Sequence, residues 1–496
     1  MVTTRSQTRS KAFKWLSLPA EIRLMILEAI VYRKNPGWAS LASVCREWQY
    51  VLEKVNFRTI KLRASCLDGL EYVISPRKRK LIQHIYFNVE LPRYSSRCDS
   101  RRLPSVNINP PVNKGIRKLF SILSTWRPAN SLTLEINVYS PSDCKHWFKN
   151  LYLSSDDVEH DENTMSDVWR TGSQYHDPKH GWRHGRQVRS PPETAMLRLF
   201  RPIVLKLDDM LPRVEAVTRL IIRRQLRRCF SPPSLGLLLR SLGRLEHLSY
   251  EPWMGYHDAY MANDQYIAEI LRFDLHNTLK SLIVFRDSRE FYDLFPKGAA
   301  HIQQGYGLFA PREALSRTFA AKSLNLQHLA ISFMVNAEEL FRHCQSTWTW
   351  LRLQSLALTS QLLQDDWEKR SRIPDLLYQA GAHVQNMPLL HTFVLWNGGK
   401  AHACAFIYRV GRDTASVTWR GSWHLELSPE VLKPWQLAAS KLLRSEDAEL
   451  QIKQEHIAAA INSHGDAIFH LELPCQVVEP ASLWQIRREA YSLPES

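Results

Sequence analysis

The first part of the chain carries apolar residues at helical spacing on two faces of one predicted helix. This helix is expected to begin near Pro19, because proline suits the first helical position, where a backbone N–H is not needed. One stripe contains Ile22, Met25, Ile26, Ala29 and Ile30. A second stripe, on a different face, contains Leu24, Leu27 and Val31. A helix with so few polar positions must be covered from two sides.

A helix break and a second amphipathic helix follow. The Asn35-Pro36-Gly37 sequence ends the first helix, and a short helical segment is predicted from Trp38 to Ser43. In the next helix the apolar positions again have helical spacing: Trp48, Val51, Leu52 and Val55. These helices form a small module with more apolar surface than its own core can hide. Such a unit normally needs a partner or a neighbouring domain.

Beyond residue 60 the pattern changes to alternating strands and helices, and one apolar phrase recurs. Copies of this L-x-x-L-x-L phrase begin at Leu245, Leu279, Leu326, Leu353 and Leu390, with fainter copies at Ile82 and Val217. In leucine-rich repeats the last two apolar positions lie on a strand, and the rest of the unit returns as a helix. The intervals of 34, 47, 27 and 37 residues are uneven. The pattern favours an α/β fold with an irregular leucine-rich-repeat-like body. A non-repetitive α/β sheet domain is the alternative.

The end of the chain is predicted to be a small α+β region. The expected strands are 403–409 and 416–423, with a strand-like segment at 467–473, and the expected helices are 428–443, 451–461 and 480–491. The predicted division of the chain is a basic disordered tail (1–14), a helical module (15–60), a strand/helix region (61–240) with a mobile insertion (154–192), a repeat-like domain (241–445) and C-terminal helices with a strand (446–496).

The insertion is acidic in its first half and rich in basic residues and histidines in its second half. His176, His180 and His184 have the spacing of metal ligands on a helix, but Pro178 and Gly181 argue against a helix there. No metal site is therefore predicted. A passive insertion is the main interpretation, and a loop that contacts a substrate or regulator is the alternative.

Composition narrows the class of protein. The chain has 496 residues, a net charge of +16 and 44% apolar residues, which suits packed cores in two or three folding units. No apolar run is long enough for a membrane span, and the N-terminus does not resemble a secretory signal. Eight cysteines without a C-x-x-C pair predict free thiols in a reducing compartment. We expect a cytoplasmic or nuclear protein.

The positive charge occurs in scattered clusters at residues 77–80, 97–102 and 223–228. No RNP-like strand, paired Cys/His finger or basic zipper region accompanies them. We interpret these clusters as solvated basic surface, with a nuclear import signal at 77–80, and keep direct nucleic-acid binding as an alternative.

No nucleotide-binding, hydrolase or zinc-protease motif occurs, so no catalytic or cofactor-binding residue is predicted. Asp365 and Asp366, which precede Trp367, indicate the first turn of a helix rather than an acid/base pair.

The N-terminal module resembles an F-box, the motif that docks substrate receptors onto the Skp-type adaptor of SCF (cullin-RING) ubiquitin ligases. The matching residues are Leu18, Pro19, Glu21, Ile22, Ile26, Leu27, Val44, Cys45, Arg46 and Trp48. By this resemblance, the residues that face the adaptor or support that surface are Leu18, Pro19, Ile22, Ile26, Leu27, Val44, Cys45 and Trp48. The resemblance also implies that Cys45 has a packing role. The alternative is an ordinary helical subdomain packed on the rest of the chain.

The region from about 240 to 440 resembles a C-terminal domain of unknown function that filamentous-fungal proteins carry behind F-boxes. The residues that carry this likeness include Trp396-Asn397-Gly398, Ala403-Cys404 and Thr418-Trp419-Arg420-Gly421. Together the two resemblances imply a non-catalytic receptor that binds the Skp-type adaptor and an unknown target protein for ubiquitin-dependent degradation. The alternative function is a basic nuclear scaffold or a nucleic-acid- or chromatin-associated protein without a ligase role.

Overall fold

The computed structural model describes residues 15–33, 35–94, 110–127, 131–143, 178, 182–183, 186–187, 199–200, 202–206, 210–253, 260–287, 313–444 and 449–491. The predicted tail (1–14), the basic residues at 97–102 and the three histidines of the insertion lie outside these residues. Of the insertion itself, the structure describes a short antiparallel pair, β4 (Trp182–Arg183) and β5 (Arg186–Gln187).

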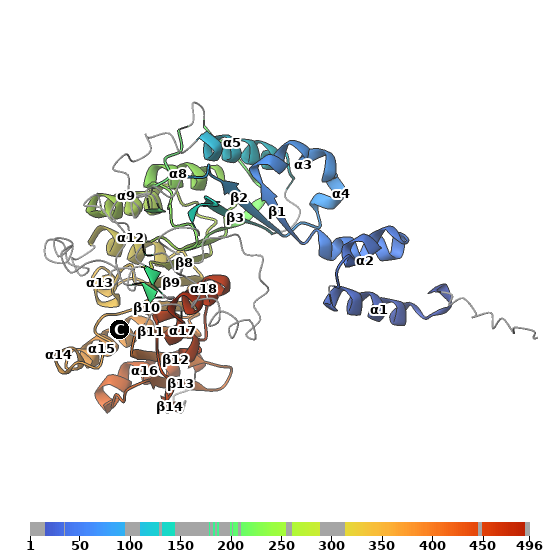
Figure 1. Ribbon diagram of the computed structural model, residues 1–496. Helices are drawn as coiled ribbons and strands as arrows, with labels where there is room; N and C mark the ends of the chain where they lie inside the picture. The colour runs from blue at the N-terminus through green and yellow to red at the C-terminus, as the bar shows by residue number, and fades with distance from the viewer. Residues whose placement is uncertain are drawn as a thin grey trace, which may run out of the picture.

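Twelve strands form one sheet within the described residues, which confirms the predicted α/β class (Figure 1). In spatial order they are β1 (Thr59–Arg63), β2 (His84–Glu90), β3 (Leu132–Tyr139), β6 (Val217–Ile222), β7 (His247–Tyr250), β8 (Ser281–Phe285), β9 (His328–Ser332), β10 (Ser355–Thr359), β11 (Thr392–Gly399), β12 (His402–Val410), β13 (Ala415–Gly421) and β14 (Leu450–His456). The sheet continues across the predicted domain limits at 240 and 445.

The strands from β1 to β11 are parallel and stand in chain order, as in a solenoid of strand–helix units. Their register aligns the apolar phrase: the central positions that pair in turn are Leu220, Leu248, Leu282, Leu329, Leu356 and Phe393. Each of these side chains is buried, so the uneven intervals are absorbed by the helices and loops and not by the strands. After β11 the chain turns back, and β12 and β13 run antiparallel before β14 pairs in parallel with β13.

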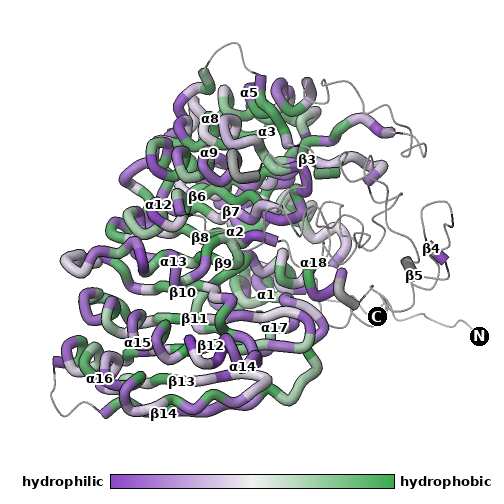
Figure 2. The backbone as a smooth tube through the Cα atoms, turned by 90° about the vertical axis from the view of Figure 1, so that its left-hand side faces the viewer, coloured by the Kyte–Doolittle hydropathy of each residue, from purple (hydrophilic) through white to green (hydrophobic). Residues whose placement is uncertain are grey.

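Helices return along one face of the sheet and stack beside one another (Figure 2). They are α5 (Pro110–Ser124), α8 (Pro232–Ser241), α9 (Tyr260–Phe273), α12 (Glu313–Ser323), α13 (Ala337–Arg342), α15 (Ile373–Val384) and α16 (Pro429–Leu443). The phrase side chains of the strands point to these helices and form the main core. None of the described helices is long and apolar enough to span a membrane.

Shorter helices join these units. They are η3 (Ala64–Cys66), α3 (Leu67–Val73), α4 (Pro76–Arg79) and α14 (Trp367–Arg370). The first turn predicted at Asp365 and Asp366 is confirmed, because the Asp366 side chain accepts hydrogen bonds from the backbone N–H groups of Glu368 and Lys369.

On the opposite face of the sheet, two C-terminal helices, α17 (His464–Leu471) and α18 (Pro480–Tyr491), cover the strands in the second half of the sheet. A second apolar core lies beneath them, built from strand residues such as Ile283, Phe285 and Trp396 and from Ala467 and Ile486 of the helices. Figure 2 shows both helices on the side of the strands away from the α8–α16 row. This part of the face, which an open solenoid would leave to solvent, is therefore filled here by the chain itself.

Two predicted elements at the C-terminal end are wrong. Residues 450–456 form the edge strand β14 rather than a helix, and residues 464–471 form the helix α17 rather than a strand. The predicted helices 428–443 and 480–491 are confirmed as α16 and α18, and the predicted strands 403–409 and 416–423 are confirmed as β12 and β13.

The N-terminal helices follow the sequence-based prediction. They are η1 (Trp15–Ser17), α1 (Ala20–Arg33), η2 (Trp38–Ser43) and α2 (Arg46–Asn56). Gly37 has a φ of 84°, so glycine is suited to the turn that reverses the chain between α1 and η2.

Candidate functional site

The N-terminal helices stand apart from the body of the protein. Figure 1 shows α1 and α2 beside the β1 end of the sheet, with α1 on the far side of α2 from the strands. α2 leads directly into β1, and α4 contacts it through Lys78, whose ammonium group lies 3.8 Å from Glu53 and 4.8 Å from the ring centre of Phe57. The body thus holds the module by its second helix and leaves α1 outermost.

A small core holds α1 and α2 together. Leu27 of α1 and Leu52 of α2 are fully buried. The ring centroids of Trp15 and Trp48 lie 5.2 Å apart, so η1 packs on the start of α2. These contacts use only one face of α1.

Glu47 of α2 holds η1 and the start of α1 in place by polar contacts. Its carboxylate accepts a hydrogen bond of 2.8 Å from the Trp15 indole N–H and one of 2.9 Å from the Arg23 guanidinium. Arg23 also donates to the backbone carbonyl of Leu18 at 2.7 Å. The hydrogen bonds from Trp15 and Arg23 lower the pKa of Glu47. The start of α1 is therefore set in one orientation relative to α2.

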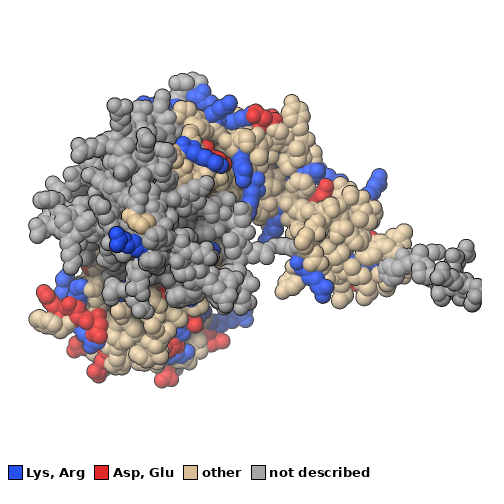
Figure 3. All heavy atoms as spheres, in the orientation of Figure 1, with Lys and Arg blue, Asp and Glu red and all other residues tan. Residues whose placement is uncertain are grey.

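An apolar stripe on α1 has no cover among the described residues. It consists of Ile22, Met25, Ala29 and Tyr32, which follow one another at helical spacing and point away from Leu27. Ile22 is 42% exposed, Met25 63% and Tyr32 89%. We call these four residues the α1 stripe. In Figure 3, few charged residues mark the visible surface of the module.

The residues predicted to form or support an adaptor surface fall into three groups. Pro19, Ile22, Val44 and Cys45 are exposed, Leu18, Ile26 and Trp48 are partly buried, and Leu27 is fully buried. Leu27 can therefore only support the surface. Because Cys45 is exposed at the start of α2, the packing role that the resemblance implies would require a bound partner.

The sequence-based site omitted three members of the α1 stripe. Met25, Ala29 and Tyr32 lie on the same exposed face as Ile22. Helical spacing pointed to Met25 and Ala29, but both faces of the predicted helix were apolar. The sequence could not tell which of them α2 would cover.

The basic cluster at 223–228 is buried, so its interpretation as solvated surface is wrong. These arginines follow β6, and their side chains form ion pairs with carboxylates from other parts of the chain. Arg223 pairs with Glu135 at 2.5 Å, and Arg228 pairs with Asp143 at 2.6 Å. With their charges paired in the interior, these arginines do not provide the phosphate-binding surface that a nucleic-acid-binding protein needs.

The same cluster ties α18 to the sheet. Arg224 pairs with Asp287 and, at 2.7 Å, with Glu489 of α18. Arg227 pairs with the other oxygen of Glu489 at 2.5 Å. Burial lowers the pKa of Arg227 to about 10, because taking the guanidinium out of water disfavours its charged form. One carboxylate on α18 therefore serves two buried guanidinium groups.

A buried carboxylate at the other end of α18 completes the attachment. Glu251, which follows β7, accepts hydrogen bonds from the Ser482 hydroxyl at 2.5 Å and from the backbone N–H of Glu479 at 2.7 Å. It also accepts one from the backbone N–H of Arg224 at 3.0 Å. Polar contacts thus hold both ends of α18 on the second face, in addition to its apolar core.

Residues 274–479 match a protein family of unknown function (DUF6546). The match runs from just before β8 to the residue before α18, and it does not include the N-terminal helices. It agrees with the resemblance of the C-terminal part to a domain of unknown function. No curated protein matches the chain.

Proposed function

We propose that this protein is an F-box-type substrate receptor of an SCF (cullin-RING) ubiquitin ligase. The N-terminal helices would bind the Skp-type adaptor through the α1 stripe, and the α/β body would hold a target protein. Ubiquitin transfer would be carried out by the other ligase subunits, so this chain would supply proximity rather than catalysis. The observation that carries the proposal is the α1 stripe, which the described residues leave uncovered, on a module that the body contacts through α2.

The apolar character of the α1 stripe supports a protein partner. Its four members form a continuous strip, and Val44, 58% exposed, adds apolar surface at the start of α2. Clustered exposed apolar side chains of this kind are typical of protein interfaces, and a few buried anchors provide most of the binding energy. The contacts of Glu47 and the small core position the stripe before any partner arrives, which lowers the entropy cost of binding.

The closed second face limits where a target could bind. In open solenoids the concave face receives the ligand, but α17 and α18 occupy that face over the strands from about β8 to β12. The target would therefore contact a surface that α17 and α18 leave open, such as the helical side, the loops at the strand ends or the edge strand β14. The identity of the target is not part of the proposal.

The proposal is tested by co-purification with a Skp-type adaptor, using the variant Ile22→Ser/Met25→Ser. Both residues are exposed, so the variant should fold. Loss of an apolar anchor typically costs about 2 kcal/mol or more, so binding should weaken about 30-fold or more. The control carries the same change at two exposed leucines of the body, Leu351→Ser/Leu389→Ser. Equal adaptor binding by both variants would argue against this interface.

Salt concentration separates the proposal from the nucleic-acid alternative. Phosphate contacts weaken steeply between roughly 50 and 200 mM salt because counterions are released on binding. An apolar interface should keep its affinity over this range. Binding of the adaptor that persists at about 300 mM salt would support the receptor. Binding of nucleic acid in place of the adaptor would support the scaffold.

A further inference from the structure

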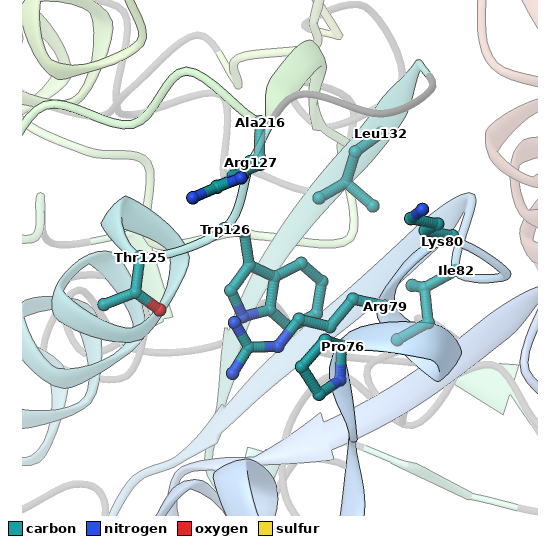
Figure 4. Close-up of a pocket in the computed structure, with 9 residues that line it drawn as sticks. All are labelled: Pro76, Arg79, Lys80, Ile82, Thr125, Trp126, Arg127, Leu132 and Ala216. Carbon is teal, nitrogen blue, oxygen red and sulfur yellow. The ribbon is translucent and has the colours of Figure 1, made fainter.

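A pocket of about 420 Å³ lies near the start of the sheet, between α4, the end of α5 and the first residues of β3. Its inner wall is apolar and contains Ile82, Leu132 and Ala216, all of which are buried (Figure 4). The volume falls in the range that small-molecule sites occupy. The pocket is separate from the α1 stripe.

Of the described residues, three basic ones and no acidic one line this pocket. They are Arg79 and Lys80 at the end of α4 and Arg127 after α5. Within the described part of the chain, neither Arg79 nor Arg127 forms an ion pair with a carboxylate. This contrasts with the arginines at 223–228, which are all matched by acidic side chains. The charges of Arg79 and Arg127 are therefore open to an anionic ligand.

A buried tryptophan forms one wall of the pocket. Trp126 is only 5% exposed, and its indole N–H has no hydrogen-bond acceptor among the described residues. The guanidinium of Arg79 lies 5.5 Å from the centre of the indole, and its Nε–H likewise has no acceptor in the part of the chain that the structure describes. Figure 4 shows the Arg79 side chain across the indole. Two donors that the described residues leave without an acceptor thus lie at the same pocket wall, where a ligand could accept from them.

We propose that this pocket binds a small organic anion: a phosphate or carboxylate group attached to an apolar or aromatic body. The anionic group would accept hydrogen bonds from Arg79 and lie near the positive charge of Arg127. The apolar or aromatic part of the ligand would pack on the apolar wall. The Arg79 side chain would rotate off the indole as the ligand enters, which gives the Trp126 N–H access to an acceptor. This inference is independent of the proposed receptor function.

The test uses the full chain and four soluble probes in calorimetric titrations. Phenyl phosphate and benzoate carry the two anionic groups, phenol lacks the charge, and inorganic phosphate lacks the ring. We expect phenyl phosphate or benzoate to bind more tightly than either control, and the tighter of the two identifies the anionic group.

Variants locate the binding. Arg79→Gln and Arg127→Gln should each weaken the tighter probe about tenfold or more, because a charge-assisted hydrogen bond or a nearby charge is lost. Arg127 is exposed, so its variant is not expected to affect folding. The matched control, Arg412→Gln, removes the same charge at an exposed turn between β12 and β13 and should bind normally.

Several results would overturn the inference. They are no binding of either anionic probe, binding of phenol equal to that of phenyl phosphate and benzoate, or an equal loss of affinity in Arg412→Gln. Inorganic phosphate that binds as tightly as phenyl phosphate would remove the role of the apolar wall and would also contradict the proposal.

Discussion

Glu489 should control how firmly α18 is attached to the sheet. Its carboxylate pairs with Arg224 and Arg227, and these two guanidinium groups are only 2% and 1% exposed. The substitution Glu489→Gln keeps the shape of the side chain and removes its charge. Arg224 retains Asp287, but Arg227 loses its ion pair, and among the described residues only the more distant charge of Asp287 still acts on it. Removing one partner of a buried ion pair typically costs about 3–5 kcal/mol.

This cost should appear as local opening of α18. If the helix detaches before the rest of the protein unfolds, a loss of about 3 kcal/mol raises the population of the open state on the order of 100-fold. Hydrogen exchange of the α18 amides, read by mass spectrometry, measures that population directly. Exchange in the α5 and α8 region should not change, because it belongs to the other core.

Two further variants make the test specific. Glu426→Gln removes an exposed carboxylate and should leave exchange in α18 unchanged. Arg227→Met/Glu489→Gln removes the stranded charge together with its partner, so α18 should exchange more slowly than in Glu489→Gln alone. The reasoning is refuted if Glu489→Gln behaves like Glu426→Gln, or if the double variant is less protected than the single one.

Two other predictions concern the same face of the sheet. Burial raises the pKa of Glu251 from 4.5 to about 7, so the folded protein keeps a proton that the unfolded chain has lost. Stability should therefore fall by about 3 kcal/mol as the pH rises from about 4.5 to above 7, and Glu251→Gln should reduce this dependence in urea unfolding at pH 5 and pH 8. A Cβ at Gly398 would overlap that of Ala467 on α17. Gly398→Ala should therefore lower the free energy of unfolding by about 1–3 kcal/mol in thermal or urea unfolding, and Gly398→Ala/Ala467→Gly should recover part of it.

The sequence was sufficient to predict the strands that carry the apolar phrase. The phrase places two apolar residues on the same side of each strand, and the pairing of Leu248 with Leu282 and of Leu329 with Leu356 follows directly from it. β3 was not predicted as a copy because Ser131 stands at the first leucine position, although Leu134 pairs with Ile85 in the same register. Where the phrase is complete, the local pattern is enough to predict a strand.

The C-terminal errors arise from segments whose local signals were ambiguous. Residues 450–456 contain Gln, Lys and Glu, which favour helices, but Leu450 and Ile452 alternate and pairing with β13 decides the outcome. In α17 the decisive signal was a helix cap: the Ser463 side chain accepts a hydrogen bond from the Asp466 N–H. That serine lies four residues before the apolar run that suggested a strand.

Contacts between distant segments could not be predicted from the sequence. Arg224 meets Glu489 across 265 positions of chain, so the cluster at 223–228 was visible as charge while its partners were not. The candidate adaptor-binding site was only partly predictable for the same reason. The apolar helix at 20–33 was evident, but only packing against α2 shows that Leu27 faces inward and Met25 outward.

Hydrogen exchange of the full chain with and without a Skp-type adaptor would test the central claim most directly. The account predicts that the adaptor slows exchange in α1 and at the start of α2, near Val44 and Cys45, while the amides of β2 to β13 are unaffected. Protection confined to the body, or no protection at all at saturating adaptor, would contradict the assignment of the N-terminal helices as the adaptor-binding site.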